Sequence, residues 1–301
     1  IPLVHTYHTL YEDYTHYITH NHFDKLSKKI VKDLTKIYCV KTAKETIVPT
    51  DKIYKLFKEK YMITKNVSVI PSGIDIERFF EENVEKDKVE QIKEKYGITK
   101  DDFTIIFVGR LAQEKNIEFL LNAQQKLIEE GMNNIKLLIV GDGPDKDNYI
   151  NISRRLNIFD KVIFTGKIEQ KEIQYYYQCA DAFVTASNSE TQGLTVIEAM
   201  AAGVVPICIN DMAFIDMLPK NSLFNNQNEY INRLITFSTN DKLREEYKIE
   251  IRKKAEEYSS VTYAQRVLNV YNGVLNGGRK DNTLKSRELR NEKEKMVEEF
   301  V

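Results

Sequence analysis

Residues 180–209 have the sequence ADAFVTASNSETQGLTVIEAMAAGVVPICI. The run at 180–187 predicts a strand, residues 193–202 predict a helix, and residues 204–209 predict a second strand. A strand, a helix and another strand in succession are typical of a parallel sheet that carries helices on its faces. We therefore expect an α/β fold around this stretch.

The same alternation continues toward the N-terminus in two series. The nearer series has predicted strands FTIIFVG, IKLLIVG and KVIFTG (103–109, 135–141 and 161–166), with helices around 117–130, 146–156 and 170–178. The earlier series has predicted strands IPLV, KIYCVKT and VSVIPSG (1–4, 36–42 and 67–73), with helices over 24–35 and 49–61. Two such series predict two Rossmann-like domains that face each other, each with a parallel sheet.

The expected domains follow from these series. They are the C-terminal part of one Rossmann-like domain (1–80), a second Rossmann-like domain (81–260), and a C-terminal helix that returns toward the first domain and ends in a charged tail (261–301). The polar stretch EENVEKDK after Phe79, with a short helix that ends at Gly97, is the candidate linker. Because the chain opens at Ile1 in what resembles the end of a buried strand, we expect upstream strands of the first domain to be missing.

Composition fits a globular protein and excludes some functions. Hydrophobic residues make up 42% of the 301 residues, and 44 Lys and Arg balance 45 Asp and Glu. The neutral total gives no argument for nucleic acid as a partner. No apolar run approaches the roughly 18 residues that span a bilayer, and no leader opens the chain. The cysteines Cys39, Cys179 and Cys208 lie in apolar runs, which indicates reduced thiols in a cytoplasm.

Two glutamates frame the strongest candidate site. Glu190 precedes Gly193, and Glu198 follows one turn into the predicted helix. The N–H groups of Gly193, Leu194 and Thr195 at a helix start suit a diphosphate, while Glu190 would reach sugar hydroxyls and Glu198 a ribose. The alternative is an ordinary first helical turn whose acidic residues complement the helix dipole.

Two cations follow a neighbouring strand. In FVGRLAQEKN (107–116), Gly109 ends the strand and Arg110 and Lys115 lie in the next loop. Together they could hold a diphosphate and stabilise it as it leaves; alone they would be surface charges. The glycine loop VGDGP (140–144) lacks the third glycine of the dinucleotide fingerprint, which argues against a dehydrogenase.

Taken in order, the motifs GR with EK, GDGP, FTG and SETQGLTVIEAMAAG resemble the nucleotide-binding domain of retaining glycosyltransferases of family 4, which have the GT-B fold. The resemblance extends from about Val67 to Tyr271, and it includes VIPSGIDIERF (69–79), which resembles the segment that links the two domains. It implies that Arg110 and Lys115 contact the donor diphosphate, Glu190 the transferred sugar and Glu198 the ribose. It also implies that the backbone near Lys167 and Ile168 meets the base.

The first residues carry all five histidines. Their positions (5, 8, 16, 20 and 22) match no standard zinc spacing, so we expect no metal site. The family resemblance places His8 over the donor sugar. The stretch HTYHTLYEDYTHY resembles bacterial diacylglycerol glucosyltransferases. This resemblance implies a lipid acceptor, with Glu12 and Asp13 as candidate contacts.

A helix over residues 24–35 carries a basic stripe formed by Lys25, Lys28, Lys29, Lys32 and Lys36. Leu26, Ile30, Leu34 and Ile37 take the other face, which we interpret as core-facing. The stripe is a solvated face or a contact for anionic lipid headgroups. Lys52, Lys55 and Lys58 continue the basic character.

These features predict a retaining, metal-independent hexosyltransferase without a cofactor. The expected donor is a UDP-sugar, with UDP-glucose as the first candidate, and the expected acceptor is a diacylglycerol-type lipid at the inner face of a bacterial cell membrane. A transferase that uses a soluble or cell-wall sugar acceptor, and a nucleotide-sugar-binding remnant without turnover, are the alternatives; an NAD-type binder ranks third. The sequence leaves the donor sugar, the oligomeric state and the activity of this chain open.

Overall fold

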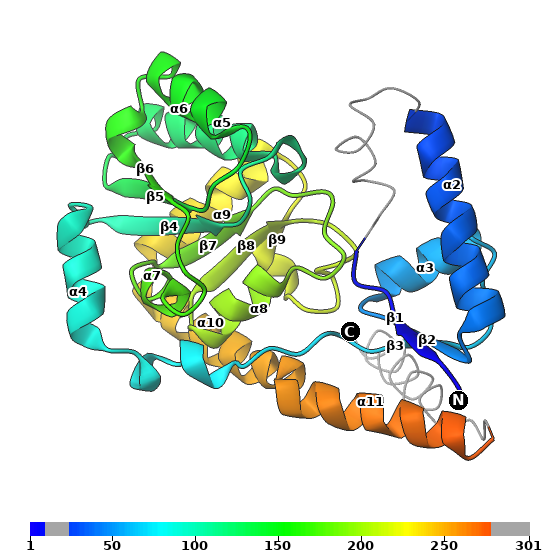
Figure 1. The fold of residues 1–301 in the computed structure, drawn as a ribbon. Helices are drawn as coiled ribbons and strands as arrows, with labels where there is room; N and C mark the ends of the chain where they lie inside the picture. Colours follow the sequence, from blue (N-terminus) through cyan, green and yellow to red (C-terminus); the bar gives the residue numbers. More distant parts are fainter. Residues whose placement is uncertain (10–23, 278–301) are drawn as a thin grey trace, which may run out of the picture.

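A computed structural model describes residues 1–9 and 24–277, and it contains two parallel sheets (Figure 1). The smaller sheet has the order β1-β2-β3 and is formed by Val4–Thr6, Glu45–Val48 and Val67–Val69. Helices α2 (Asp24–Lys36) and α3 (Asp51–Glu59) connect these strands. Its small core packs Tyr7, Val48 and Ile53 with Phe57 and Tyr61.

The larger sheet has the order β6-β5-β4-β7-β8-β9, and all neighbouring strands are parallel. Its strands are β4 Phe103–Val108, β5 Ile135–Val140, β6 Val162–Gly166, β7 Ala182–Thr185, β8 Val205–Ile209 and β9 Leu223–Phe224. Its helices are α4 Lys86–Lys95, α5 Ile117–Glu129, α6 Lys146–Arg155, α7 Ile173–Tyr177, α8 Leu194–Ala201, α9 Gln227–Thr239 and α10 Asp241–Ala255. The strand order reverses between β4 and β7, which is where open α/β sheets bind ligands.

Burial explains why the strands of the larger sheet were predictable. Nearly every residue of β4 and β5 is buried, because helices cover both faces of a parallel sheet and both faces must be apolar (Figure 1). These strands therefore appear as continuous apolar runs in the sequence. The three cysteines are free and buried, as the sequence indicated.

The predicted strand at 36–42 is wrong. Residues Ile37–Thr42 continue α2 as a π-helix, and the central strand of the smaller sheet is Glu45–Val48. The reason is burial: within the run IYCV only Cys39 is buried, whereas Thr46, Ile47 and Val48 are buried between two neighbouring strands. Strand β9 and helix α9 were not expected from the sequence either.

The chain crosses between the sheets earlier than the polar candidate linker, in the segment 69–79 that the family resemblance indicated. Val84, Val89 and Ile98 belong to the core of the larger domain, so the stretch after Phe79 packs there. The crossover is the segment after β3, where Gly73 lies so close to helix α11 (Ser260–Leu275) that a Cβ atom would be 2.5 Å from the Ser259 carbonyl oxygen. Helix α11 then runs beneath the smaller sheet (Figure 1). The charged tail from residue 278 lies outside the described residues.

Candidate active site

The candidate site lies where the carboxyl ends of both sheets meet. Arg110 and Lys115 follow β4, and Glu190 follows β7, the two strands at which the order of the larger sheet reverses. His8 follows β1 of the smaller sheet, and its carbonyl oxygen accepts a hydrogen bond from the Thr191 hydroxyl at 3.0 Å. The structure thus brings residues that are 183 positions apart into one place.

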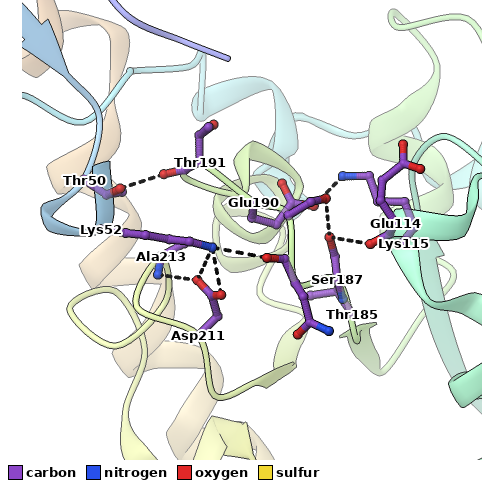
Figure 2. A network of polar contacts seen from close by, with 12 residues as sticks. Thr50, Lys52, Glu114, Lys115, Thr185, Ser187, Glu190, Thr191, Asp211 and Ala213 are labelled. Carbon is purple, nitrogen blue, oxygen red and sulfur yellow. Dashed lines mark hydrogen bonds and ion pairs between the residues drawn. The ribbon is translucent and has the colours of Figure 1, made fainter. Parts of the chain in front are cut away.

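Lys115 and Glu190 form an ion pair in this site. The ammonium of Lys115 lies 2.5 Å from Glu190 Oε1, and the two side chains are 16% and 20% exposed (Figure 2). Lys115 ends a short 3-10 helix, Gln113–Lys115, and the Ser187 hydroxyl donates to the Glu114 carbonyl within this helix at 3.4 Å. A cation and an acid at the switch point are the groups that the sequence placed around a donor diphosphate and its sugar.

The loop VGDGP shapes the loop that carries Arg110. A Cβ atom on Gly141 would lie 1.9 Å from the Gly109 carbonyl oxygen, and one on Gly143 would lie 2.3 Å from that of Leu111. Leu111 also donates its N–H to the Asp142 carbonyl at 3.0 Å. Both glycines are therefore required by close backbone packing next to the exposed Arg110, and the loop needs no cofactor to explain it.

Gly193 begins helix α8 in a conformation that favours glycine. Its φ is 79°, and a Cβ atom there would lie 2.5 Å from the Phe214 ring. The N–H groups at Gly193, Leu194 and Thr195 lie in the first turn, where an α-helix leaves them without partners in the helix. Leu194 is exposed, so the helix start faces outward beside Glu190.

Glu198 is buried in the second turn of α8. It is 8% exposed, and its Oε2 accepts a hydrogen bond from the Tyr177 hydroxyl at 2.8 Å, while Gln170 lies 3.4 Å from Oε1. Burial raises the pKa of Glu198, and the hydrogen bonds from Tyr177 and Gln170 oppose that rise. The two carboxylate oxygens of Glu198 are hydrogen-bond acceptors, which suits a ribose hydroxyl. In this structure their partners are the side chains of Tyr177 and Gln170.

The other expected donor contacts lie at the same edge. Lys167, exposed, and Ile168, half-buried against the core, follow β6, so they are at the far side of the β4 loop. Within residues 1–9 and 24–277, neither residue forms a hydrogen bond or ion pair with Glu190. Their contact with a base stays a prediction.

The sequence missed a set of contacts that join the two domains. We call them the interdomain clasp, which consists of Thr50, Lys52 and Ser72 on the smaller side and of Thr191, Gln192 and Asp211 on the larger side. Figure 2 shows the contacts of Thr50 with Thr191 and of Lys52 with Asp211. The Gln192 amide exchanges two hydrogen bonds with the Ser72 backbone, at 2.8 and 2.9 Å. Only the adjacency of Gln192 to Gly193 hinted at a role.

The basic helix α2 differs from expectation. Leu26, Ile30, Leu34 and Ile37 are between 47% and 55% exposed instead of core-facing, because Thr35 and Cys39 supply the buried side. Of the basic stripe, Lys28 and Lys29 are exposed and Lys32 and Lys36 are half-buried; the side chain of Lys25 lies outside the described residues. Apolar and basic side chains therefore share the surface of this helix.

Within residues 1–9 and 24–277, no three His, Cys, Asp or Glu side chains are grouped to hold a metal ion. His16, His20 and His22, like Glu12 and Asp13, lie outside the described residues. In the same ranges, no helix is long and apolar enough to cross a bilayer.

Two Rossmann-like domains whose strand ends meet at one site define the GT-B class of glycosyltransferase folds. Residues 88–254 match the family described as glycosyl transferases group 1, and residues 1–78 match glycosyltransferase family 4. The chain belongs to the group 1 glycosyltransferase family.

Two relatives extend this match. An alpha-monoglucosyldiacylglycerol synthase of Acholeplasma laidlawii is 33% identical over 294 residues, which are 93% of this chain and 71% of that protein. A synthase of the same name from Streptococcus pneumoniae is 34% identical over 224 residues, which are 74% of this chain. The matched region is about half (49%) of the length of the pneumococcal relative.

Solved structures agree on the fold. Anabaena HepE in complex with UDP and glucose superposes with a TM-score of 0.75 at 17% identity, covering 90% of this chain and 72% of that one. A glycosyltransferase from Rickettsia africae gives 0.72 at 20% identity, covering 81% and 68%. The expected GT-B fold is confirmed.

Proposed function

We propose that this glycosyltransferase moves a glucosyl group from UDP-glucose to a diacylglycerol-type lipid with retention of configuration. The ion pair between Lys115 and Glu190 at the switch point carries the proposal, because it joins a cation for the leaving diphosphate to an acid for the sugar. The two diacylglycerol synthases support the lipid acceptor, and the HepE complexes with UDP and glucose support the donor.

In the proposed reaction the bond between the sugar C1 and the β-phosphate oxygen breaks, and a bond from C1 to the acceptor hydroxyl oxygen forms on the same face. The acceptor proton passes to the leaving phosphate. Arg110, Lys115 and the first amides of α8 would stabilise the charge that develops on the diphosphate, so neither a metal ion nor a cofactor is required.

The remaining candidate site residues take supporting roles. Glu190 would bind sugar hydroxyls and Glu198 the ribose, while His8 would lie over the reacting sugar, since its backbone contacts Thr191 beside Glu190. The backbone at Gly109, Lys167 and Ile168 would line the nucleotide. In this proposal neither Glu190 nor Glu198 attacks the sugar C1, because the acceptor hydroxyl attacks directly on the same face.

We propose that the enzyme reaches its lipid acceptor by binding an anionic membrane surface through α2. Ile30, Leu34 and Ile37 would enter the interface, and Lys29 and Lys36 would pair with headgroups, each lysine adding about 1 kcal/mol near the surface. Such a face would make the protein peripheral at the inner side of the cell membrane.

The test is an acceptor and donor screen of the full-length protein with diacylglycerol in micelles that contain phosphatidylglycerol. We expect UDP-glucose to be the best donor, an α-linked lipid product, and activity that persists in EDTA. Lys115→Met should lower kcat about 10²–10³-fold and Glu190→Gln should abolish transfer, and Lys242→Met, at an exposed position of α10, is the matched control. Transfer to soluble sugars alone would remove the lipid acceptor, and a β-linked product would remove retention.

A further inference from the structure

We infer that Lys52 is a positioning residue that holds the Glu190 loop in place only when the two domains are closed. The inference rests on the proposed role of Glu190 in binding the donor sugar. Lys52 belongs to the smaller domain, whereas Glu190 belongs to the larger one. From the sequence, Lys52 was expected only as part of a basic surface.

Lys52 reaches across the domain interface from the first turn of α3. Its ammonium lies 2.8 Å from both carboxylate oxygens of Asp211 and 3.4 Å from the carbonyl oxygen of Asn188 (Figure 2). Asp211 follows β8 of the larger sheet, 159 positions along the chain. One cation therefore touches two loops of the other domain.

Both members of this pair are partly withdrawn from water. The side chains of Lys52 and Asp211 are 20% and 15% exposed, whereas Lys55 and Lys58 on the same helix are exposed. Exposed ion pairs contribute little, but pairs with limited solvent access and defined geometry contribute more. Lys52 thus differs from the neighbouring lysines in what it contacts as well as in its exposure.

Asp211 is itself fixed and leads to the start of α8. Its Oδ1 accepts a hydrogen bond from the Ala213 N–H at 2.8 Å, and the Phe214 N–H donates to its backbone carbonyl at 2.9 Å. The Phe214 ring packs against Gly193. The start of α8 is thus supported from within the larger domain, and Asp211 is a fixed partner for Lys52.

The Glu190 loop is held from the smaller domain on both sides of Glu190. Before it, Lys52 contacts the Asn188 carbonyl; after it, the Thr50 hydroxyl donates to the Thr191 carbonyl at 2.7 Å. Gln192 is paired with the Ser72 backbone. When the domains separate, all these contacts break together, so the position of Glu190 depends on closure.

The consequence is a split between binding and turnover. Arg110 and Lys115 belong to the larger domain, so the nucleotide can still bind when Lys52 is lost. A displaced Glu190 loop would instead misplace the sugar, and a displacement of about 1 Å can cost about 10²-fold in rate.

We would measure kcat, KM and UDP affinity for Lys52→Met, Asp211→Asn and the double variant of the full-length protein, with Lys55→Met as the matched control. We expect Lys52→Met to lower kcat about 10²-fold while the Kd for UDP changes less than twofold. The double variant should lose no more than either single variant, because both remove one interaction. Lys52→Arg, which keeps the charge opposite Asp211, should recover part of the rate.

A Lys52→Met enzyme as active as Lys55→Met, or parallel losses of kcat and UDP affinity, would overturn the inference. The proposed function fails differently, through a wild-type protein that transfers no sugar. For that case, fluorescent labels on the two domains give an independent readout. Lys52→Met should shift the labels toward separation while Lys55→Met does not; no shift would again contradict the clasp.

Discussion

The Lys115 ammonium and the Glu190 carboxylate are 2.5 Å apart, so the cation expected at the leaving diphosphate is already paired with the acid expected at the sugar. Both side chains are at most one-fifth exposed, which limits screening by solvent. A diphosphate that enters this site must compete with Glu190 for Lys115. In the proposed reaction, Glu190 therefore holds Lys115 in place before the nucleotide binds. The same ion pair lowers the affinity for the nucleotide, because it must be broken first.

This competition predicts opposite effects of two substitutions on UDP binding. Lys115→Met removes a ligand of the diphosphate, so we expect weaker UDP binding and a loss of about 10²–10³-fold in kcat. Glu190→Gln frees Lys115, so UDP should bind as tightly as before or several-fold more tightly, although sugar transfer is lost. Calorimetric titration with UDP and with UDP-glucose measures both effects. Weaker UDP binding by Glu190→Gln would contradict the competition.

A matched pair of glycines flanks α8, with Gly193 at its start and Gly203 just beyond its end. Gly193 and Gly203 have φ values of 79° and 71°, but a Cβ atom meets the Phe214 ring only at Gly193 and nothing within 4 Å at Gly203. Gly203→Ala should cost about 1 kcal/mol of stability through backbone strain alone and leave transfer intact. Gly193→Ala should cost more and weaken UDP binding.

Thermal unfolding and UDP titration of both variants separate these effects. Equal losses of stability and unchanged UDP affinity would show that the Phe214 contact does not position the helix start.

The predictable part of this molecule is the larger sheet. Strands such as β4 and β5 are buried on both faces, so long apolar runs between glycines marked them in the sequence. The smaller domain was harder because its strands have three or four residues. From its sequence, the run IYCV (37–40) resembles a strand more than ETIV (45–48) does. Only the packing shows that ETIV is the strand and that it pairs with β1 and β3.

The candidate site divides in the same way. Lys115 and Glu190 were expected together because both follow strands of one sheet, whose carboxyl ends share an edge. Lys52 and Asp211 belong to different sheets, and their contact depends on how two domains are placed, which no spacing encodes. The need for glycine in VGDGP likewise does not follow from spacing, since the Gly109 backbone lies against Gly141 and the Leu111 backbone against Gly143.

Glu198 should make stability fall with rising pH. Burial raises its folded-state pKa, so the folded protein holds a proton that the unfolded chain releases, and stability declines as pH rises from the unfolded pKa of about 4.5 through the folded value. Glu198→Gln keeps an oxygen acceptor for Tyr177 and removes this titration.

We therefore expect the melting temperature of Glu198→Gln to exceed that of the wild type by an amount that grows from pH 4 to pH 7, while the affinity for UDP falls. A melting-temperature difference independent of pH would show that Glu198 does not titrate in this range.

The mixed face of α2 should govern binding to anionic vesicles. Ile30 and Leu34 are about half exposed, so Ile30→Ser with Leu34→Ser should change stability little but remove apolar area that would enter the lipid. At about 25 cal/mol per Å² of apolar surface buried, the loss should weaken binding about tenfold or more. Val261→Ser with Leu275→Ser, at exposed positions of α11, is the matched control.

Cosedimentation with phosphatidylglycerol vesicles and with uncharged phosphatidylcholine vesicles separates the apolar from the basic contribution. The α2 serine variant should bind phosphatidylglycerol less well than the α11 variant, and Lys29→Glu should reduce the preference for phosphatidylglycerol over phosphatidylcholine. If both serine variants bind like the wild type, α2 is not the face that meets the membrane, because its apolar side chains then contribute no more than those of α11.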